Sequence, residues 1–386
     1  MVFTLFQKSE YTSRLHKVQA LMEQENLCAL FLTSGPNHYY LSGYPHEWNA
    51  PSRPSILIIP LQGDPTLIVH KGIREEVQRY SWITNIRTYK QRSQAPLKEI
   101  EEAILDTGIK GGEIGAELAF EQRMDISLKD FLKLQLTLPQ FEFVDAGNLL
   151  LSVRTTKSPA EITLMRRACQ ITGQSFEEAF SKAKSGMSEN EISRLIQIAI
   201  IKRGGAKPKM WMTSGEGNYS FNAKGPTDRV IRNGDFIWVD VSCNVSGYWS
   251  DFCRAAVIGQ PSLLQEQTQQ RISEITFLGV EMVRPGIKVS EIAKTVNQAM
   301  QDLNIDILHQ ISVGASRIGH GIGLTQTEPP QVAIFDETVL KTGMVITIEP
   351  AIATSYGTFR VEEDVLVTTD GFEVLSETQR ELWVIQ

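Results

Sequence analysis

Apolar positions in the first part of the chain alternate between helical and strand spacing. Residues 11–24 carry apolar side chains at the spacing of an amphipathic helix, and the apolar run at 29–33 is typical of a short buried strand. Two further apolar runs, 55–60 and 66–70, flank a Gly-Asp-Pro turn and are predicted to pair as strands. This mixture predicts an α/β domain of moderate size.

The pattern changes near Arg154. The sequence Ser158-Pro159-Ala160-Glu161 is a helix start, with Ser as the N-cap, Pro at the first helical position and Glu at the third. A chain of 386 residues is also too long for one ordinary core. We therefore predict two domains, residues 1–154 and residues 155–386, and an α/β (α+β) fold class.

The second of these domains contains a short internal repeat. At a constant offset of 100 residues, Gly186, Glu191-Ile192 and Ala199 recur as Gly286, Glu291-Ile292 and Ala299. Both copies open a helix after a glycine-containing turn. Because few residue types are favoured at helix starts, the repeat alone is compatible with chance as well as with duplication.

A predicted hairpin brings two carboxylates together. The apolar run Phe236–Val241 is followed by a turn at Asn244–Gly247 and by a returning strand. Asp240 and Asp251 are equidistant from a centre between residues 245 and 246. Directly opposed residues of an antiparallel pair share a face, with Cβ atoms ~5 Å apart. The two carboxylates are therefore expected to face each other.

A second hairpin repeats this arrangement further along the chain. Residues 344–349 form an apolar strand pattern, residues 354–357 a turn, and residues 359–362 the returning strand. Glu349 and Glu362 are again equidistant from the centre of the turn. Two equivalent hairpins, together with the helix repeat, predict a duplicated half-domain that gathers four carboxylates at one site.

Four carboxylates at one site require a compensating charge. Opposed like charges destabilise a hairpin, and protonation or a wet sheet edge would explain one such pair. For two pairs in apolar strands, a shared divalent cation is the better explanation. His320, in the glycine-rich run 319–323, is the natural nitrogen ligand beside these oxygens. One nitrogen among many oxygens suits Mn²⁺, Co²⁺, Fe²⁺ or Zn²⁺, and five ligands predict two ions about 3.5–4 Å apart.

Charge and composition narrow the function classes. The formal net charge of −7, without a basic block, argues against a nucleic-acid partner. The longest apolar runs fall short of the ~20 residues of a membrane span, and the N-terminus lacks an apolar signal core. Four scattered cysteines without a CxxC pair indicate reduced thiols. We therefore expect a cytoplasmic protein.

Four segments of the second domain resemble the pita-bread metallopeptidases, which include methionine aminopeptidase, aminopeptidase P and prolidase, with creatinase and ectoine hydrolase as relatives. They are Asp240 to Asp251, Gly319-His-Gly-Ile-Gly-Leu324, Gly343-Met-Val-Ile-Thr-Ile-Glu349-Pro350 and Arg360-Val-Glu-Glu-Asp364. The first domain resembles the smaller domain of the prolidase and creatinase members. The resemblance thus covers nearly the whole chain, and it implies a creatinase-like N-terminal domain followed by a pita-bread domain with pseudo-two-fold halves.

The resemblance also implies roles for the site residues. All five metal-ligand positions of the family match by type and spacing: Asp240, Asp251, His320, Glu349 and Glu362. In the family, a water or hydroxide that bridges the ions attacks the scissile carbonyl. Glu349 would exchange a proton with the nucleophile and the leaving nitrogen. Arg360 and Tyr248 would orient ligating carboxylates.

Three positions depart from the family pattern. Peptidases of this family carry two further histidines that hold the substrate carbonyl, and here Ala223, preceded by Asn222, and Thr327 stand in their places. A usual Thr is Cys253. Removing one such hydrogen-bond donor typically costs 10²–10³ in rate. The departures put a standard Xaa-Pro peptidase mechanism in doubt.

A loop in the first domain offers replacement histidines. A predicted turn at 34–38 leads into an aromatic, proline-rich loop, and the segment from Asn37 to Trp48 carries His38 and His46. Its composition is typical of a binding lid, so either histidine could enter the site from a partner subunit of a homodimer. A loop that packs on its own domain is the simpler interpretation.

Three functions remain open at this stage. The first is an Xaa-Pro dipeptidase or aminopeptidase acting on short peptides. The second is a hydrolase of a small non-peptide C–N bond, as in ectoine hydrolase. The third is a binding module without activity, which the complete set of five ligands disfavours. The sequence predicts a metal-dependent hydrolase and favours the peptidase slightly.

Overall fold

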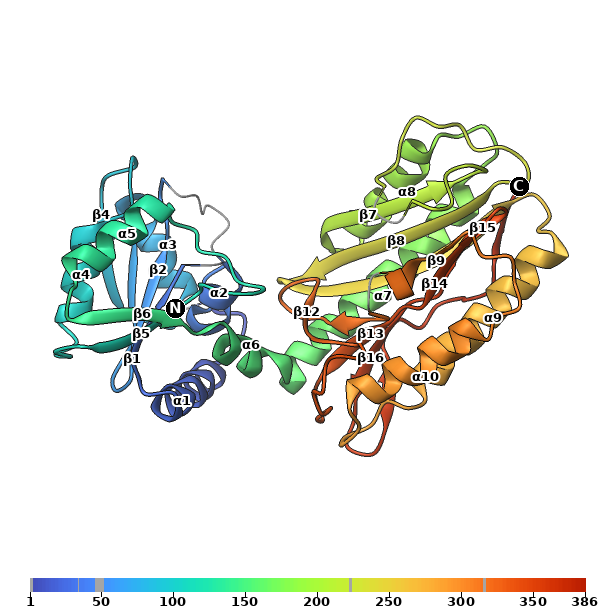
Figure 1. Ribbon diagram of the computed structural model, residues 1–386. Coiled ribbons are helices and arrows are strands. Elements are labelled where there is room, and N and C mark those ends of the chain that lie inside the picture. Colours follow the sequence, from blue (N-terminus) through green and yellow to red (C-terminus); the bar gives the residue numbers. More distant parts are fainter. Residues whose placement is uncertain (1–2, 34, 46–51, 222–223, 315–316) are drawn as a thin grey trace. The chain divides into compact units, whose positions relative to one another are not determined.

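The computed structural model describes residues 1–386 except 1–2, 34, 46–51, 222–223 and 315–316. The chain divides into two compact units, Met1–Arg154 and Thr155–Gln386 (Figure 1). None of the helices in the described ranges is long and apolar enough to cross a membrane.

The first unit is built on a six-stranded mixed sheet with the order β4-β3-β2-β1-β5-β6. Its strands are β1 (Leu27–Leu32), β2 (Ile56–Pro60), β3 (Thr66–His70), β4 (Asn85–Tyr89), β5 (Gly112–Ala116) and β6 (Phe141–Asp145). Its helices are α1 (Lys8–Gln24), α2 (Gly35–Ser42), the 3₁₀ turn η1 (Lys71–Ile73), α3 (Arg74–Tyr80), α4 (Leu97–Leu105), α5 (Leu128–Thr137) and α6 (Gly147–Thr155).

Most predicted elements of this unit are present. The antiparallel pairing of β2 with β3 is confirmed, with Ile56 opposite Ile68. The predicted turn at 34–38 is wrong, because helix α2 begins at Gly35. Proline is tolerated in the first turn of a helix, so Pro36 does not prevent it. The buried face of α2 then favours the helix over the turn.

The second unit contains three sheets with the orders β18-β9-β8-β7, β12-β11-β13-β16-β17 and β10-β14-β15. Its strands are β7 (Ala206–Ser214), β8 (Phe236–Val245), β9 (Tyr248–Ile258), β10 (His309–Gln310), β11 (His320–Gly321), β12 (Glu328–Gln331), β13 (Val345–Ile348), β14 (Ala351–Thr354), β15 (Gly357–Arg360), β16 (Glu363–Val367), β17 (Phe372–Val374) and β18 (Trp383–Ile385). Its helices are α7 (Pro159–Lys182), α8 (Glu189–Lys202), α9 (Leu263–Val280), α10 (Val289–Gln301) and α11 (Ile311–Gly314).

Helix α7 begins where the sequence predicts. Ser158 Oγ accepts a hydrogen bond from Glu161 N, and Glu161 Oε2 accepts one from Ser158 N, which completes a capping box. This helix packs against β8 and β9, and α8 packs against α7 and β7. Helix α9 packs against β13, β15 and β16 and carries α10 beside it, so each helix pair covers strands of one half (Figure 1).

The internal repeat is a structural duplication. Gly186 N donates to Ile231 O at 3.0 Å, and Gly286 N donates to Leu340 O at 2.9 Å. Both glycines have a positive φ, 91° and 90°, which a residue with a side chain rarely adopts. The same turn, strand contact and helix start therefore recur in the two halves of the unit.

The two halves meet through their hairpins. Phe236 of β8 and Phe359 of β15 are fully buried, with ring centroids 4.6 Å apart. Beside them, the hydroxyls of Thr213 in β7 and Thr358 in β15 lie 3.1 Å apart. This packing brings the ligand-bearing strands of both halves to one place.

Candidate metal centre

The first carboxylate pair shares one face of the β8–β9 hairpin, but the predicted register is wrong. Asp240 lies opposite Cys253, and Asp251 lies opposite Ser242. The hairpin closes through the two-residue turn Ser246-Gly247, with φ of 51° and 91°, and this moves the centre by one residue. The partners change by two positions, which preserves the face. The two carboxylates are therefore diagonal neighbours.

The second pair has the predicted register. The β13–β16 ladder ends with Ile348 opposite Glu363, and the β14–β15 ladder starts with Ala351 opposite Arg360. Glu349 and Glu362 lie in the gap between these ladders, opposite each other in the common register. Pro350 has no N–H to donate, which accounts for the break in the strand.

All five predicted ligands line one cavity of about 210 Å³ in the second unit. His320 Nε2 lies 3.8 Å from Asp251 Oδ2 and 3.7 Å from Glu349 Oε1. Ligand atoms of Asp251, His320 and Glu362 all lie within 4.8 Å of one another. The structure thus brings the four carboxylates and the imidazole together.

The imidazole is held with one nitrogen towards the carboxylates. His320 Nδ1 lies 3.0 Å from Gly321 O, so a proton on Nδ1 leaves the lone pair of Nε2 for a metal. A Cβ atom on Gly319 would lie 2.0 Å from Thr347 O, and one on Gly321 would lie 2.2 Å from Pro329 O. The glycines around His320 therefore permit a close approach of neighbouring strands that other residues would prevent.

Burial of the carboxylates is costly without a cation. Loss of hydration raises the pKa of Asp240 to about 6, an effect that Arg360 partly offsets. Burial also raises the pKa of Asp251 and of Glu362 well above the ordinary range, and neighbouring carboxylates add to the rise. Burial lowers the pKa of His320. These pKa shifts show that the ionised carboxylates are unfavourable at this site without a compensating positive charge, which a bound metal ion would supply.

Two carboxylate oxygens without a hydrogen-bond partner also indicate a cation site. Within the described ranges, Asp240 Oδ1 and Glu362 Oε2 are buried and have no hydrogen-bond partner. Buried polar atoms are normally paired, and each such exception requires an explanation. A donor set of carboxylate oxygens and one imidazole nitrogen fits a divalent ion that would satisfy these atoms.

Arg360 lies beside the carboxylates as predicted. Its Nη1 is 3.2 Å from Glu349 Oε2 and 3.8 Å from Asp240 Oδ2. Burial by itself lowers the pKa of this guanidinium, but the carboxylates around it, Glu349 first, raise the pKa above its ordinary value. Arg360 is therefore a permanent cation that orients two of the predicted ligands.

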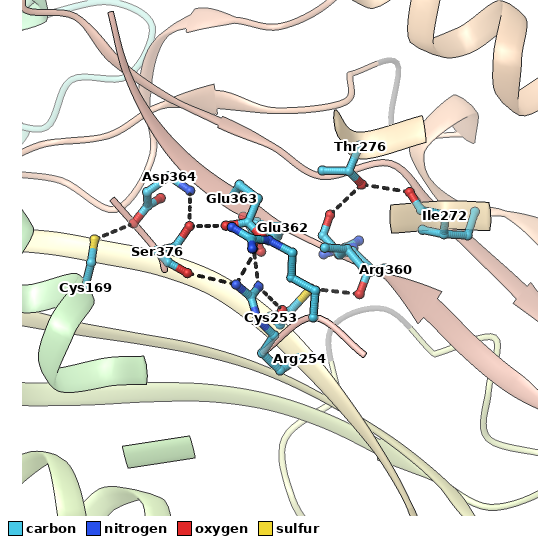
Figure 2. Close-up of polar contacts among 12 residues, drawn as sticks. Cys169, Cys253, Arg254, Ile272, Thr276, Arg360, Glu362, Glu363, Asp364 and Ser376 are labelled. Carbon is cyan, nitrogen blue, oxygen red and sulfur yellow. Dashed lines mark hydrogen bonds and ion pairs between the residues drawn. The ribbon is translucent and has the colours of Figure 1, made fainter. Parts of the chain in front are cut away.

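A buried polar network fixes the main chain behind the carboxylates (Figure 2). Arg254 Nη1 donates to Glu362 O at 2.8 Å, and its Nη2 donates to Glu363 Oε1 at 3.0 Å. Asp364 Oδ2 accepts from Asp251 N at 2.9 Å. Cys253, which replaces the usual threonine, donates from Sγ to Arg360 O at 3.4 Å. The ligand-bearing strands of both halves are therefore cross-linked by hydrogen bonds.

Comparisons with known proteins agree with this geometry. Residues 163–369 match the model of metallopeptidase family M24, and residues 14–156 match the creatinase/prolidase N-terminal domain. The first match covers more than half of the chain. The chain belongs to metallopeptidase family M24. It is therefore a metal-dependent hydrolase of the peptidase type, because members of this family use divalent metal ions for catalysis.

Similar proteins match nearly the whole of this M24 chain. The Xaa-Pro dipeptidase of Pyrococcus horikoshii is 27% identical over 371 residues, which cover 96% of this chain and 98% of the relative. The prolidase structure from Pyrococcus horikoshii has a TM-score of 0.82 at 25% identity, with 96% and 99% of the two chains covered. The Xaa-Pro dipeptidase structure from Bacillus anthracis shares the fold, with a TM-score of 0.85 at 22% identity over 97% and 100% of the two chains.

The Tyr248 hydroxyl has a hydrogen-bond partner outside the set of predicted ligands. Its hydroxyl donates to Glu161 Oε1 at 2.7 Å, at the start of α7. A hydroxyl has one proton, and this bond directs it to Glu161. Tyr248 instead ties the β8–β9 hairpin to the capping box of α7.

The histidines of the first unit have different outcomes. His38 is buried within that unit, and its ring nitrogens lie 3.2 Å from Ser42 Oγ and 2.8 Å from Ser55 Oγ. This geometry favours the interpretation that His38 packs on its own domain. His46 lies outside the described residues, and so do Asn222 and Ala223. Thr327 lines the cavity, as its position in the family pattern implies.

Four further residues line the cavity and were missed from the sequence: Trp211, Ser312, Arg317 and Gln326. Trp211 of β7 lies opposite Asp240 and shares its face, which only the strand pairing reveals. Gln326 precedes Thr327, and its position next to a departure from the family pattern is the one signal that could have identified it.

Gln326 contacts a predicted ligand directly. Its Nε2 donates to Asp251 Oδ1 at 3.1 Å, and Ser242 Oγ donates to the same oxygen at 2.7 Å. These two bonds leave Asp251 Oδ2 as the oxygen that faces His320. Gln326 therefore fixes the orientation of Asp251 towards a metal.

We expect the substitution Gln326→Leu to weaken metal binding by about 10- to 100-fold, the usual effect of removing a hydrogen-bond partner from a ligand. Competition with a chelator of known affinity measures this change. The matched control is Gln267→Leu, an exposed glutamine on α9. Equal metal affinity of the wild type and Gln326→Leu would contradict the positioning role.

Proposed function

We propose that this protein hydrolyses the peptide bond before proline in short peptides, with two divalent ions held by Asp240, Asp251, His320, Glu349 and Glu362. The observation that carries the proposal is the convergence of these side chains on one cavity of about 210 Å³. That volume lies below the about 300–1,000 Å³ typical of pockets for drug-sized ligands, which favours a small substrate. The full-length similarity to Xaa-Pro dipeptidases supports the choice of bond. Residues 155–386 are the proposed catalytic domain.

When bound, the ions would lower the pKa of a water molecule towards neutrality and polarise the scissile carbonyl. Within this chain, Glu349 is the proposed proton carrier, accepting a proton from the nucleophile and returning it to the proline nitrogen. Arg360, 3.2 Å from Glu349 Oε2, would hold that carboxylate in place. His320 would supply the nitrogen ligand through Nε2.

Thr327 modifies this scheme. In place of the usual histidine, it offers a hydroxyl that can donate one hydrogen bond within the cavity. A neutral hydroxyl is a weaker donor to a developing oxyanion than an imidazolium. We therefore propose a peptidase with slower turnover than members that carry both histidines.

A small non-peptide amide is the second candidate substrate. The small cavity and Thr327 favour it, because both suit a compact ligand that needs no second histidine. The buried oxygens of Asp240 and Glu362, unpaired within the described ranges, argue against a binding module without metal. The nature and number of the ions stay predictions from the ligand set, a cytoplasmic location stays a prediction from the cysteine pattern and the N-terminal sequence, and a homodimer stays a prediction from the family resemblance.

The test is turnover of Xaa-Pro dipeptides by purified protein loaded with Mn²⁺, Co²⁺ or Zn²⁺, beside a chelated sample. We expect metal-dependent release of proline. Absence of turnover of these dipeptides and of Xaa-Pro tripeptides, in protein shown by elemental analysis to hold two ions, would overturn the peptidase and leave the non-peptide amide.

A further inference from the structure

A buried ion pair lies outside the metal cavity, between the start of the second unit and the segment that carries Gln326. Lys157 Nζ is 3.7 Å from Glu328 Oε2, and both side chains are only 2% exposed. Neither residue is among those that line the cavity. Pairing often does no more than offset the hydration that two buried charges lose. Net stability alone therefore does not explain the presence of this pair.

The ammonium group of Lys157 is held in place by the main chain. Lys157 N donates to Gly343 O at 2.8 Å, and Lys157 Nζ donates to Thr155 O at 3.1 Å. The segment around Gly323 packs directly on the ion pair, since a Cβ atom on this glycine would lie 2.9 Å from Lys157 Cε and 3.0 Å from Glu328 Oε2. The lysine thus provides a fixed positive charge beneath this segment.

The other carboxylate oxygen of Glu328 organises the turn that precedes it. Glu328 Oε1 lies 2.9 Å from Thr325 N, which donates to it, and 3.0 Å from Thr325 Oγ1. The same hydroxyl lies 3.0 Å from Thr327 O. Gln326, the residue between the two threonines, donates from Nε2 to Asp251 Oδ1 at 3.1 Å. A continuous series of contacts therefore leads from the ion pair to a predicted metal ligand.

We propose that Lys157 and Glu328 are a positioning pair for the metal centre, which holds the turn at 323–328 so that Gln326 orients Asp251 towards the ion. Removal of the lysine charge would leave a buried carboxylate without compensation, and the turn that this carboxylate organises would lose its fixed place. The inference rests on the metal binding of the proposed function and is independent of the choice of substrate.

The test is a double-mutant cycle on metal affinity, with Lys157→Met, Gln326→Leu and the variant that combines them. Competition with a chelator of known affinity measures the binding of Co²⁺ to each protein. We expect Lys157→Met to weaken Co²⁺ binding by about 10-fold in the wild type, the effect of disturbing a partner of a ligand. In the Gln326→Leu background it should weaken binding by less than about twofold, because the effect passes through Gln326. The absorption spectrum of bound Co²⁺ should change in the same way in both single variants.

The matched control removes a lysine from an exposed ion pair. Lys288 Nζ lies 2.8 Å from Glu337 Oε2, and Lys288→Met should leave Co²⁺ affinity and absorption unchanged. Melting temperatures of the chelated proteins show whether each variant folds. If Lys157→Met does not fold, the variant that combines it with Glu328→Gln replaces it in the cycle, because it leaves neither charge buried alone.

The cycle distinguishes positioning from a merely structural role. Equal losses of affinity from Lys157→Met in the two backgrounds would show that its effect does not pass through Gln326, and the inference would be overturned. Unchanged Co²⁺ affinity in Lys157→Met would overturn it as well. A wild type that binds no Co²⁺ would instead refute the proposed metal centre, and the inference would fall with it.

Discussion

The substitution Glu349→Gln is expected to lower kcat by about 10²–10⁴-fold, the usual contribution of a positioned acid–base group. Glu349 lies 3.7 Å from His320 Nε2 and 3.2 Å from Arg360 Nη1, so it is close to both the predicted nitrogen ligand and the cavity cation. The amide keeps the shape of the side chain but can no longer accept a proton. Turnover of an Xaa-Pro dipeptide and the metal content of the same sample, measured together, distinguish loss of proton transfer from loss of metal.

The matched control is Glu337→Gln. Glu337 is exposed and pairs with Lys288 at 2.8 Å, away from the cavity, and its substitution should change kcat by less than about twofold. An activity of Glu349→Gln within tenfold of the wild type would remove Glu349 from the mechanism. Melting temperatures of both variants show whether the fold is intact.

The second large effect concerns stability without metal. In chelated protein, the free energy of unfolding should contain a component that falls as the pH rises from about 4 towards 7. Burial raises the pKa of Asp240 from its ordinary 3.8 to about 6, so the folded state holds a proton that the unfolded state has lost. Stability falls with pH wherever the folded state binds more protons. At 1.36 kcal/mol per pKa unit, Asp240 alone contributes about 3 kcal/mol.

Urea unfolding of the wild type and of Asp240→Asn, both with chelator, isolates this component. The lowered pKa of His320 acts in the opposite direction, and the difference between the two proteins removes most of that contribution. We expect Asp240→Asn to be the more stable protein near pH 7 and the two to converge near pH 4. Addition of Mn²⁺ should reverse the order, because the metal binds the ionised carboxylate. If the free energy of unfolding had the same pH dependence in the wild type and in Asp240→Asn, the pKa of Asp240 would not be raised by folding.

The sequence was sufficient to predict that the carboxylates converge, because alternate residues of a strand lie on the same face of the sheet even when the register is shifted by two positions. Asp240 and Asp251 were assigned the wrong partners, yet a change of two positions left both on the same side of the hairpin. The error came from the turn, where Ser246 adopts a left-handed φ of 51° that few residues other than glycine favour. The second pair was predicted correctly because both of its ladders keep one register through the break at Pro350.

The rest of the site depends on tertiary contacts. Gln326 reaches Asp251 from a different strand connection, and Arg317 meets Gln331 only once β11 and β12 pair. Neither contact leaves a periodic signal in the sequence. Tyr248 is a further example, since its place in the family pattern does not indicate its hydrogen bond to Glu161.

The division of the predicted ligands between the two halves has a consequence for the order of folding events. Asp240 and Asp251 come from the first half of the second unit, and His320, Glu349 and Glu362 from the other. A zinc finger gathers its ligands locally, so the ion can nucleate the fold. In this protein, the two halves of the second unit must pack together before the five predicted ligands are close to one another. An ion that binds after the transition state slows unfolding and leaves the folding rate unchanged. We therefore expect the metal to lower the unfolding rate of the second unit without changing its folding rate.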